Sequence, residues 1–114
     1  VVGARILVMG LSFKENCPDI RNTKIVDFIK ALKEYDLDLD IYDPWVDDTE
    51  VQHEYGLAPI KTLQQGMYDA IVIAVAHNEF KSMSAQEFHA LGKAKHVLYD
   101  LKYVLNKTDA DLRL

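Results

Sequence analysis

The chain has 114 residues, 49% of them hydrophobic, and a formal net charge of -5. This length fits one domain, 1–114, and the apolar fraction can fill a core, which excludes a disordered tail. The acidic balance argues against nucleic acid or an anionic membrane as the main partner, and the longest apolar run, residues 70–76, is too short to span a bilayer.

The hydrophobic pattern alternates between strand-like and helix-like segments. Apolar runs and two-residue alternation predict four main strands, over residues 5–11, 37–42, 68–76 and 96–101. Helical spacing and end signals predict a helix capped by Asn22 or Thr23 and reaching about Tyr35, and further helices over 47–55, 61–66 and 84–91. From Lys102 on we expect a loop with a frayed turn. This alternation indicates right-handed βαβ units, and therefore a three-layer α/β/α Rossmann-like domain with a mostly parallel sheet.

The start of the chain and its cysteine count suggest its setting. The sequence begins with Val1 and enters a strand almost at once, so we expect a piece of a longer protein. Cys17 is the only cysteine, which excludes an intrachain disulfide and a cysteine-rich zinc site and makes a cytoplasmic location the default. The histidines at 53, 89 and 96 show no metal-ligand spacing, so no metal site is predicted.

The segment "GLSFKENCPDIRNTK", residues 10–24, lies where open α/β proteins bind nucleotides, between a strand and a helix. It lacks the G-x-G-x-x-G spacing of a dinucleotide loop. Lys14 and Arg21 could instead hold phosphate oxygens, helped by the N-terminus of the following helix. The alternative is that both cations are solvated or paired with Glu15 and Asp19, and spacing alone slightly favours it.

Three other residues invite a chemical role. Asp43 ends the second strand and could accept a hydrogen bond from a ribose hydroxyl. However, Pro44 follows directly, and the first loop lacks the glycines that admit a pyrophosphate, so a strand-end turn is favoured. His77 could be a general base, but without a visible partner we interpret it as a loop residue bonded to backbone. Cys17 lies near cations that favour a thiolate, yet no base is evident, so we interpret it as an ordinary small residue.

Four stretches together carry a resemblance: "GLSFKENCPDIRNTK", "YDPWV", "DAIVIAVAHNEF" and "YDLK". They resemble the C-terminal domain of the UDP-glucose/GDP-mannose dehydrogenase family, especially the bacterial UDP-N-acetylhexosamine 6-dehydrogenases of surface-polysaccharide (capsule and O-antigen) synthesis. The resemblance covers the whole chain but only about the last third of such an enzyme.

The resemblance implies a parent chain with three parts: an N-terminal NAD-binding Rossmann domain, a long central helix that forms a homodimer, and this UDP-sugar-binding domain. The parent oxidises the primary alcohol of a UDP-hexose or UDP-N-acetylhexosamine to a uronate, in two NAD-dependent steps through a cysteine thioester. That cysteine has no counterpart here, so no catalytic residue is expected in this chain and it should be inactive alone.

The family motif also implies roles for individual residues. Lys14 is expected to reach the UDP-sugar, Phe13 to line the substrate pocket, and Arg21 to reach NAD across the interdomain cleft. Near the end the family carries Asp-Gly-Arg, where this chain reads Asp100, Leu101 and Lys102. Lys102 keeps the charge for the substrate but loses the bidentate fork of arginine, as in the branch that acts on N-acetylated sugars.

The sequence is also compatible with a second class of function. The same fold pattern would suit a stand-alone nucleotide sensor, or a flavodoxin-like interaction module without catalysis. A dinucleotide-binding loop and a glycine-flanked cysteine upstream of Val1 would decide for the enzyme.

Overall fold

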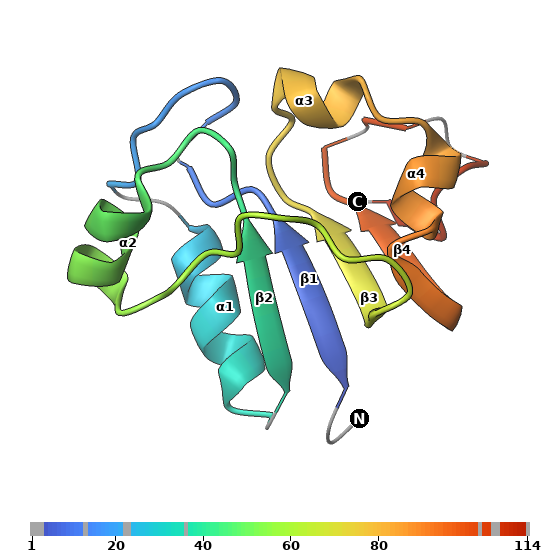
Figure 1. Cartoon of the computed structure of the whole chain (residues 1–114), viewed down its shortest axis with the longest axis horizontal. Coiled ribbons are helices and arrows are strands. Elements are labelled where there is room, and N and C mark those ends of the chain that lie inside the picture. The colour runs from blue at the N-terminus through green and yellow to red at the C-terminus, as the bar shows by residue number, and fades with distance from the viewer. Residues whose placement is uncertain are drawn as a thin grey trace.

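The computed structural model describes residues 4–12, 14–21, 24–35, 37–102, 104–105 and 108–113. Within them the strands form one parallel sheet in the order β2-β1-β3-β4-β5 (Figure 1). Because every strand runs the same way, their carboxyl ends meet at one edge of the sheet. The strands are β1 (Arg5–Met9), β2 (Asp38–Tyr42), β3 (Tyr68–Ile73), β4 (Gly92–Asp100) and β5 (Leu112–Arg113).

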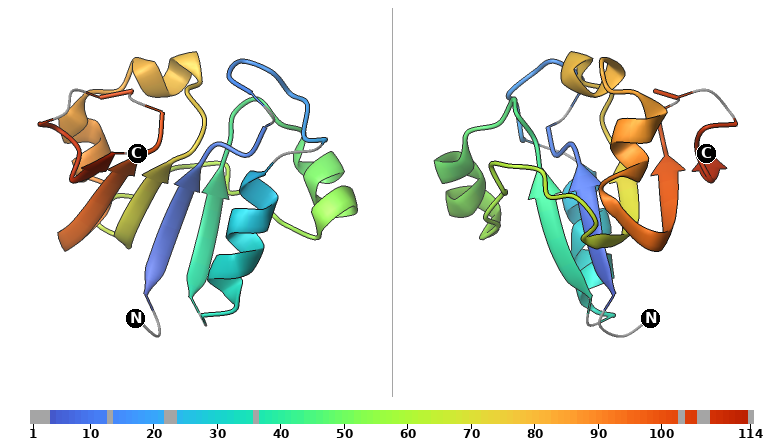
Figure 2. Two further views of the ribbon diagram at one scale, coloured as in Figure 1. Left: turned by 180° about the vertical axis from the view of Figure 1, so that it is seen from behind. Right: turned by 45° about the vertical axis from the view of Figure 1, so that its right-hand side comes forward.

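Helices cover both faces of this sheet (Figure 2). The helices of the described residues are α1 (Ile25–Lys33), α2 (Asp48–Tyr55), α3 (Asn78–Lys81) and α4 (Ala85–His89). Side chains of α1 and α2 join one apolar cluster, and those of α3 and α4 join another. The predicted three-layer α/β/α architecture with a parallel sheet is therefore confirmed.

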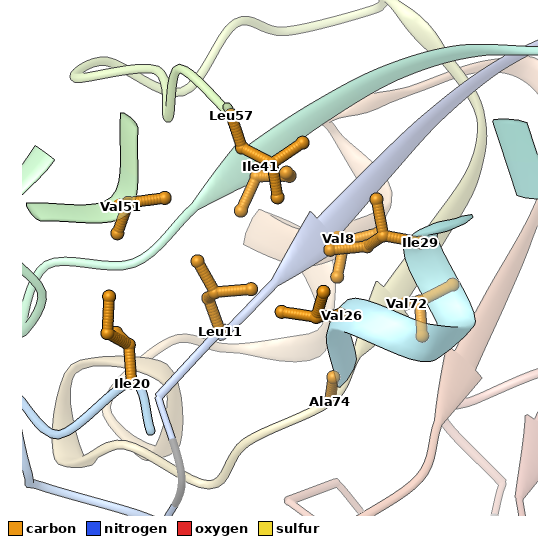
Figure 3. Packing of buried hydrophobic residues seen from close by; sticks show 10 residues of the cluster. All are labelled: Val8, Leu11, Ile20, Val26, Ile29, Ile41, Val51, Leu57, Val72 and Ala74. Carbon is orange, nitrogen blue, oxygen red and sulfur yellow. The ribbon is translucent and has the colours of Figure 1, made fainter. Parts of the chain in front are cut away.

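Alternate residues of the central strands face the two helical layers. Val8 points to the layer of α1 and α2, where it lies beside Ile29 in a cluster that also contains Val51 (Figure 3). Leu7 and Met9 point the other way, to a cluster that contains Phe80 and Phe88. A strand buried on both faces reads as a continuous apolar run, which explains the sequence of β1 and β3.

One predicted helix is wrong, and two short elements were not predicted. Residues 61–66 form bends and turns, and Gly66 there donates its N–H to the carbonyl of Ala90 at the end of α4 (2.9 Å). In so short a segment, tertiary packing decides the backbone conformation, and here the Gly66 N–H bonds to a neighbouring element instead of to its own segment. No element was predicted for the segment that forms the short α3, and β5 lies in the tail that was expected to be a loop. The predicted caps of α1, residues 22 and 23, lie outside the described residues.

Strand β4 begins four residues earlier than predicted, at Gly92. Tyr68 pairs with Gly92, whereas Ala70 pairs with Val97, so residues 93–96 of β4 lie opposite a single residue of β3. These four residues form a large bulge. The strand therefore starts at the residue that directly follows the predicted helix 84–91.

We expect Gly10→Ala to destabilise the fold by about 2–5 kcal/mol. Gly10 has a φ of 106°, and a Cβ there would lie 2.6 Å from the Cβ of Val75 and 2.8 Å from its backbone nitrogen. Gly66→Ala is the matched control, because Gly66 has a φ of 69° but no atom within 4 Å of the added Cβ. The free energy of unfolding of the Gly66→Ala variant, measured by urea denaturation, should fall by only about 1–2 kcal/mol. Equal losses in the two variants would show that crowding by Val75 is unimportant.

Candidate functional site

The carboxyl edge of the sheet collects the buried polar side chains of the described residues. Ser12, Asp43, His77 and Asp100 are the polar residues there that are at most 5% exposed. They follow or end β1, β2, β3 and β4 in turn. Buried polar groups need partners, so the bonds of these four side chains determine how the loops at this edge are held.

Asp43 anchors the end of β1 to the end of β2. Its Oδ2 accepts from the backbone N–H of Leu11 (2.7 Å) and of Ser12 (3.0 Å), and its Oδ1 accepts from the N–H of Trp45 (2.8 Å). Burial acts to raise the pKa of Asp43, but the hydrogen bonds from His77 and from these backbone groups outweigh it and lower the pKa below its ordinary value. The predicted strand-end turn is confirmed, and the ionised carboxylate also binds a neighbouring strand.

His77 completes this cluster, contrary to the expectation that it lacks a side-chain partner. Its Nδ1 accepts from the N–H of Asn16 (2.8 Å), so Nε2 carries the ring proton. That Nε2 lies 3.0 Å from Asp43 Oδ2 and 3.2 Å from Ser12 Oγ. The ring is completely buried. The carboxylate that His77 contacts lies 34 positions away along the chain, which is why sequence spacing did not reveal it.

The cluster of Ser12, Asp43 and His77 is not arranged for nucleophilic catalysis. In a catalytic triad the serine and the carboxylate bond to opposite nitrogens of the imidazole, but here both face Nε2. The Ser12 hydroxyl instead donates to the carbonyl of Lys14 (2.9 Å). Because the imidazole nitrogen that faces its hydroxyl is the protonated one, Ser12 is not activated and serves to hold the loop that begins there.

The loop after β1 is fastened to the loop after β3. Asn16, at a φ of 55°, donates its N–H to His77 and accepts from the N–H of Asn78 through Oδ1 (2.8 Å). The Lys14 side chain, which precedes this contact, is exposed and has no partner among the described residues. The ammonium group of Lys14 is therefore unpaired among the described residues and lies on a loop whose backbone is held by hydrogen bonds.

Arg21 lies farther along the same loop and is paired. Its Nε and NH2 lie 3.1 and 3.2 Å from the two carboxylate oxygens of Asp19, and its side chain is 83% exposed. The hydrogen bonds from Arg21 lower the pKa of Asp19. The alternative from the sequence, a pair with Asp19, is therefore confirmed for Arg21 in this structure.

Asp100 organises the turn after β4. It is fully buried, and its carboxylate accepts from the backbone N–H groups of Lys102 (3.1 Å), Val104 (3.1 Å) and Leu105 (2.8 Å). The Lys102 side chain is exposed. Since β3 alone separates β1 from β4, the two strand ends that lead to Lys14 and Lys102 lie about 10 Å apart on the sheet edge.

The structure thus brings Lys14 and Lys102 to one edge, with Arg21 at the far end of the first loop. Phe13 lies outside the described residues. Cys17 is half-buried and has no base beside it among the described residues.

A cavity of about 390 Å³ lies elsewhere, along α4, lined by residues that include Leu63, Met83 and Leu91, and none of the predicted site residues lines it. No helix of the described residues is long and apolar enough to cross a membrane.

Known proteins contain similar domains. Residues 7–107 match the UDP-binding domain of the UDP-glucose/GDP-mannose dehydrogenase family. The whole chain is 57% identical to part of the UDP-N-acetyl-D-glucosamine 6-dehydrogenase of Pseudomonas aeruginosa and 52% identical to part of that of Salmonella typhi. In both comparisons the chain spans 27% of the length of the relative.

Solved structures share the fold. UDP-D-ManNAc dehydrogenase from Pyrococcus horikoshii matches with a TM-score of 0.71 and 26% identity, over 92% of this chain and 23% of that one. NDP-N-acetyl-D-galactosaminuronic acid dehydrogenase from Methanosarcina mazei Go1 matches with a TM-score of 0.80 and 20% identity, over 95% of this chain and 22% of that one. The second likeness shows the shared fold.

We expect Asp43→Asn to lower the free energy of unfolding at pH 7 by about 2–4 kcal/mol, because an amide cannot accept all the bonds that the buried carboxylate receives. The folded-state pKa of Asp43 is depressed, so its contribution is complete above the unfolded pKa of about 3.9 and is lost as the pH falls through the folded pKa. The difference between the variant and the wild type should therefore shrink below about pH 4.

Urea denaturation over a pH series measures this difference. Asp38→Asn, at an exposed position of the same strand, is the matched control and should cost little at any pH. A penalty at Asp43 that stays constant down to pH 3 would contradict the role of the ionised carboxylate.

Proposed function

Because the chain belongs to the UDP-glucose/GDP-mannose dehydrogenase family, as its UDP-binding domain, we propose that it forms the UDP-sugar side of the active-site cleft in a cytoplasmic, NAD-dependent UDP-N-acetylhexosamine 6-dehydrogenase. Such an enzyme oxidises the primary alcohol of the sugar to a uronate, which serves surface-polysaccharide synthesis. The observation that carries the proposal is the pair of exposed lysines on the carboxyl edge of a domain with this family match.

Lys14 and Lys102 are suited to an anionic substrate. Each follows a strand at the edge where ligands of open parallel sheets bind. Each is also on a turn whose backbone is fixed by a buried carboxylate, Asp43 for the first and Asp100 for the second. A fixed turn loses little conformational entropy when it binds, so an exposed ammonium on it can contribute most of its attraction for a diphosphate.

Phe13 completes the proposed substrate side. It stands between two residues whose positions are held, Ser12 by its buried bonds and Lys14 by the bond to its carbonyl. A large aromatic ring beside the lysine would cover an apolar face of the bound sugar nucleotide. This role rests on the family motif.

Arg21 is proposed to contact NAD from the other end of the loop. NAD itself would be held mainly by a separate Rossmann domain, together with the dimer-forming central helix. The ion pair with Asp19 is exposed to solvent and therefore screened, so the guanidinium can exchange Asp19 for a phosphate without leaving a buried charge unpaired.

The domain is proposed to bind and orient the UDP-sugar and to carry out no chemical step itself. The Ser12 hydroxyl donates to a backbone carbonyl and meets only the protonated nitrogen of His77, and Cys17 has no base beside it among the described residues. The chain alone should therefore reduce no NAD. Because it forms one wall of the cleft, it should bind UDP-sugars weakly without the rest of the enzyme.

We expect Lys14→Ala to weaken the binding of UDP to this chain by about 1.5–3 kcal/mol, or roughly ten- to a hundredfold in Kd, through loss of a charge-assisted contact. Calorimetric titration with UDP, UDP-N-acetylglucosamine, GDP-mannose and NAD measures both the loss and the selectivity. Lys30→Ala is the matched control, because Lys30 is an exposed lysine near the end of α1, at the opposite edge of the sheet. UDP binding that both variants retain would refute the site.

We expect Arg21→Ala, in a dehydrogenase that carries this domain, to raise the KM for NAD more than the KM for the UDP-sugar. The physical reason is that the guanidinium reaches the cofactor side of the cleft, so ground-state binding of NAD loses a contact. Steady-state kinetics with each substrate varied in turn provide the measurement. An effect confined to the UDP-sugar would place Arg21 on the substrate side instead.

A further inference from the structure

Two histidines meet at the side of the domain that carries α4, β4 and β5. His89 ends α4, and His96 lies in the bulge of β4. Nδ1 of His89 and Nε2 of His96 lie only 2.7 Å apart. The Asp111 carboxylate, just before β5, has an oxygen within 4.8 Å of a nitrogen of each ring. Neither the spacing of these residues along the chain nor the family motif indicates this cluster.

Backbone carbonyls fix the tautomer of both rings. Nε2 of His89 lies 2.7 Å from the carbonyl oxygen of Asp109, and Nδ1 of His96 lies 2.7 Å from that of Lys93. A carbonyl oxygen only accepts, so each of these outer nitrogens carries a proton. In the neutral rings, the two nitrogens that face each other are therefore both lone pairs.

Two lone pairs at 2.7 Å repel unless a cation lies between them. That cation is either a proton shared by the rings or a metal ion bound by both. The Asp111 carboxylate adds a negative charge beside the same point, and its Oδ2 is held by the N–H of Leu98 (2.8 Å). Two imidazole nitrogens and one carboxylate are a donor set typical of a zinc site with one open position.

The surroundings match those of known metal sites in two respects. Histidines that bind a metal usually donate their other N–H to a carbonyl or carboxylate, as both do here. The backbone also makes room for the second ring: a Cβ on Gly92 would lie 2.3 Å from Cγ of His96, so only glycine lets this imidazole fold back across the start of β4.

We propose that His89, His96 and Asp111 bind a divalent transition metal of the zinc class, with water as the fourth ligand. Nitrogen ligands favour zinc, copper or nickel over magnesium or calcium. With metal–nitrogen distances of 2.0–2.1 Å, a tetrahedral ion sets the two nitrogens about 3.4 Å apart, so the rings separate by about 0.7 Å on binding. Both rings are only half-buried, which leaves room for this shift.

The metal would add a link among three segments that already meet through the hydrogen bonds of His89 with Asp109 and of Leu98 with Asp111. Strand β5 has two residues, and β4 is its one partner in the sheet. A metal bound by α4, β4 and the residue before β5 fastens this end of the described chain to the domain. Since the unfolded chain has no such arrangement, binding should stabilise the folded state.

The test is titration of the purified, chelator-treated chain with Zn²⁺ at pH 7.5, followed by calorimetry and thermal unfolding. We expect one Zn²⁺ per chain and a rise in Tm of about 10 °C at a hundredfold excess over Kd. Co²⁺ in place of Zn²⁺ should show the intense visible absorption of a tetrahedral site. This spectrum needs no variant.

His96→Gln should weaken Zn²⁺ binding at least about a hundredfold, since even the loss of an outer partner of a ligand costs ten- to a hundredfold. Gly92→Ala should also weaken it, by displacing the His96 ring. His53→Gln, on α2 and outside the cluster, is the control and should bind as the wild type does. If His96→Gln does not fold, His89→Gln replaces it.

Two results would overturn the proposal. One is the absence of saturable Zn²⁺ binding by the folded wild type, which would mean that the histidines share a proton. The other is equal affinity in the wild type and in the folded His96→Gln or His89→Gln variant.

Discussion

The oxygen Oδ2 of Asp43 is the point on which the carboxyl edge depends. Where β1 leaves the sheet, the N–H groups of Leu11 and Ser12 lose the strand partners that satisfied the residues before them, and this one oxygen accepts from both. The same oxygen faces Nε2 of His77. The ends of β1, β2 and β3 are therefore held by a single ionised group that is almost fully removed from water.

Hydrogen bonds connect this carboxylate to the loops. His77 accepts from the N–H of Asn16 through Nδ1, and Asn16 accepts from the N–H of Asn78 through its side-chain oxygen. At β4 a second buried carboxylate, Asp100, binds three backbone N–H groups of the next turn in a similar way. Networks whose members are all satisfied are rigid, and they leave the turns that carry Lys14 and Lys102 already shaped before any ligand arrives.

The sequence was sufficient for the layout of the sheet but not for the contacts at its edge. Apolar runs such as β1 and β3 differ from amphipathic segments such as α1 by their period, so a parallel sheet between helices follows from local pattern. The bond between Asp43 and His77 joins residues 34 positions apart, and the meeting of His89 with His96 depends on a four-residue bulge. Neither has a period or a motif, and both are consequences of packing. The predicted helix at 61–66 is the converse case: the local pattern indicated a helix, but the Gly66 N–H bonds to the carbonyl of Ala90, a tertiary contact that the sequence does not reveal.

The turn after β4 determines how the side chain of Lys102 is presented. In this family an arginine is expected there, yet the acidic residue two positions earlier is not free to pair with either side chain, because Asp100 is buried and its oxygens are occupied by backbone N–H groups. The side chain at 102 must therefore project to solvent, whichever cation it carries. A guanidinium would offer a rigid fork that selects one orientation of an anion, whereas the ammonium of Lys102 offers a compact charge on a flexible stem. The turn fixes where the charge starts, and the residue type decides how strictly the side chain would direct a ligand at the proposed site.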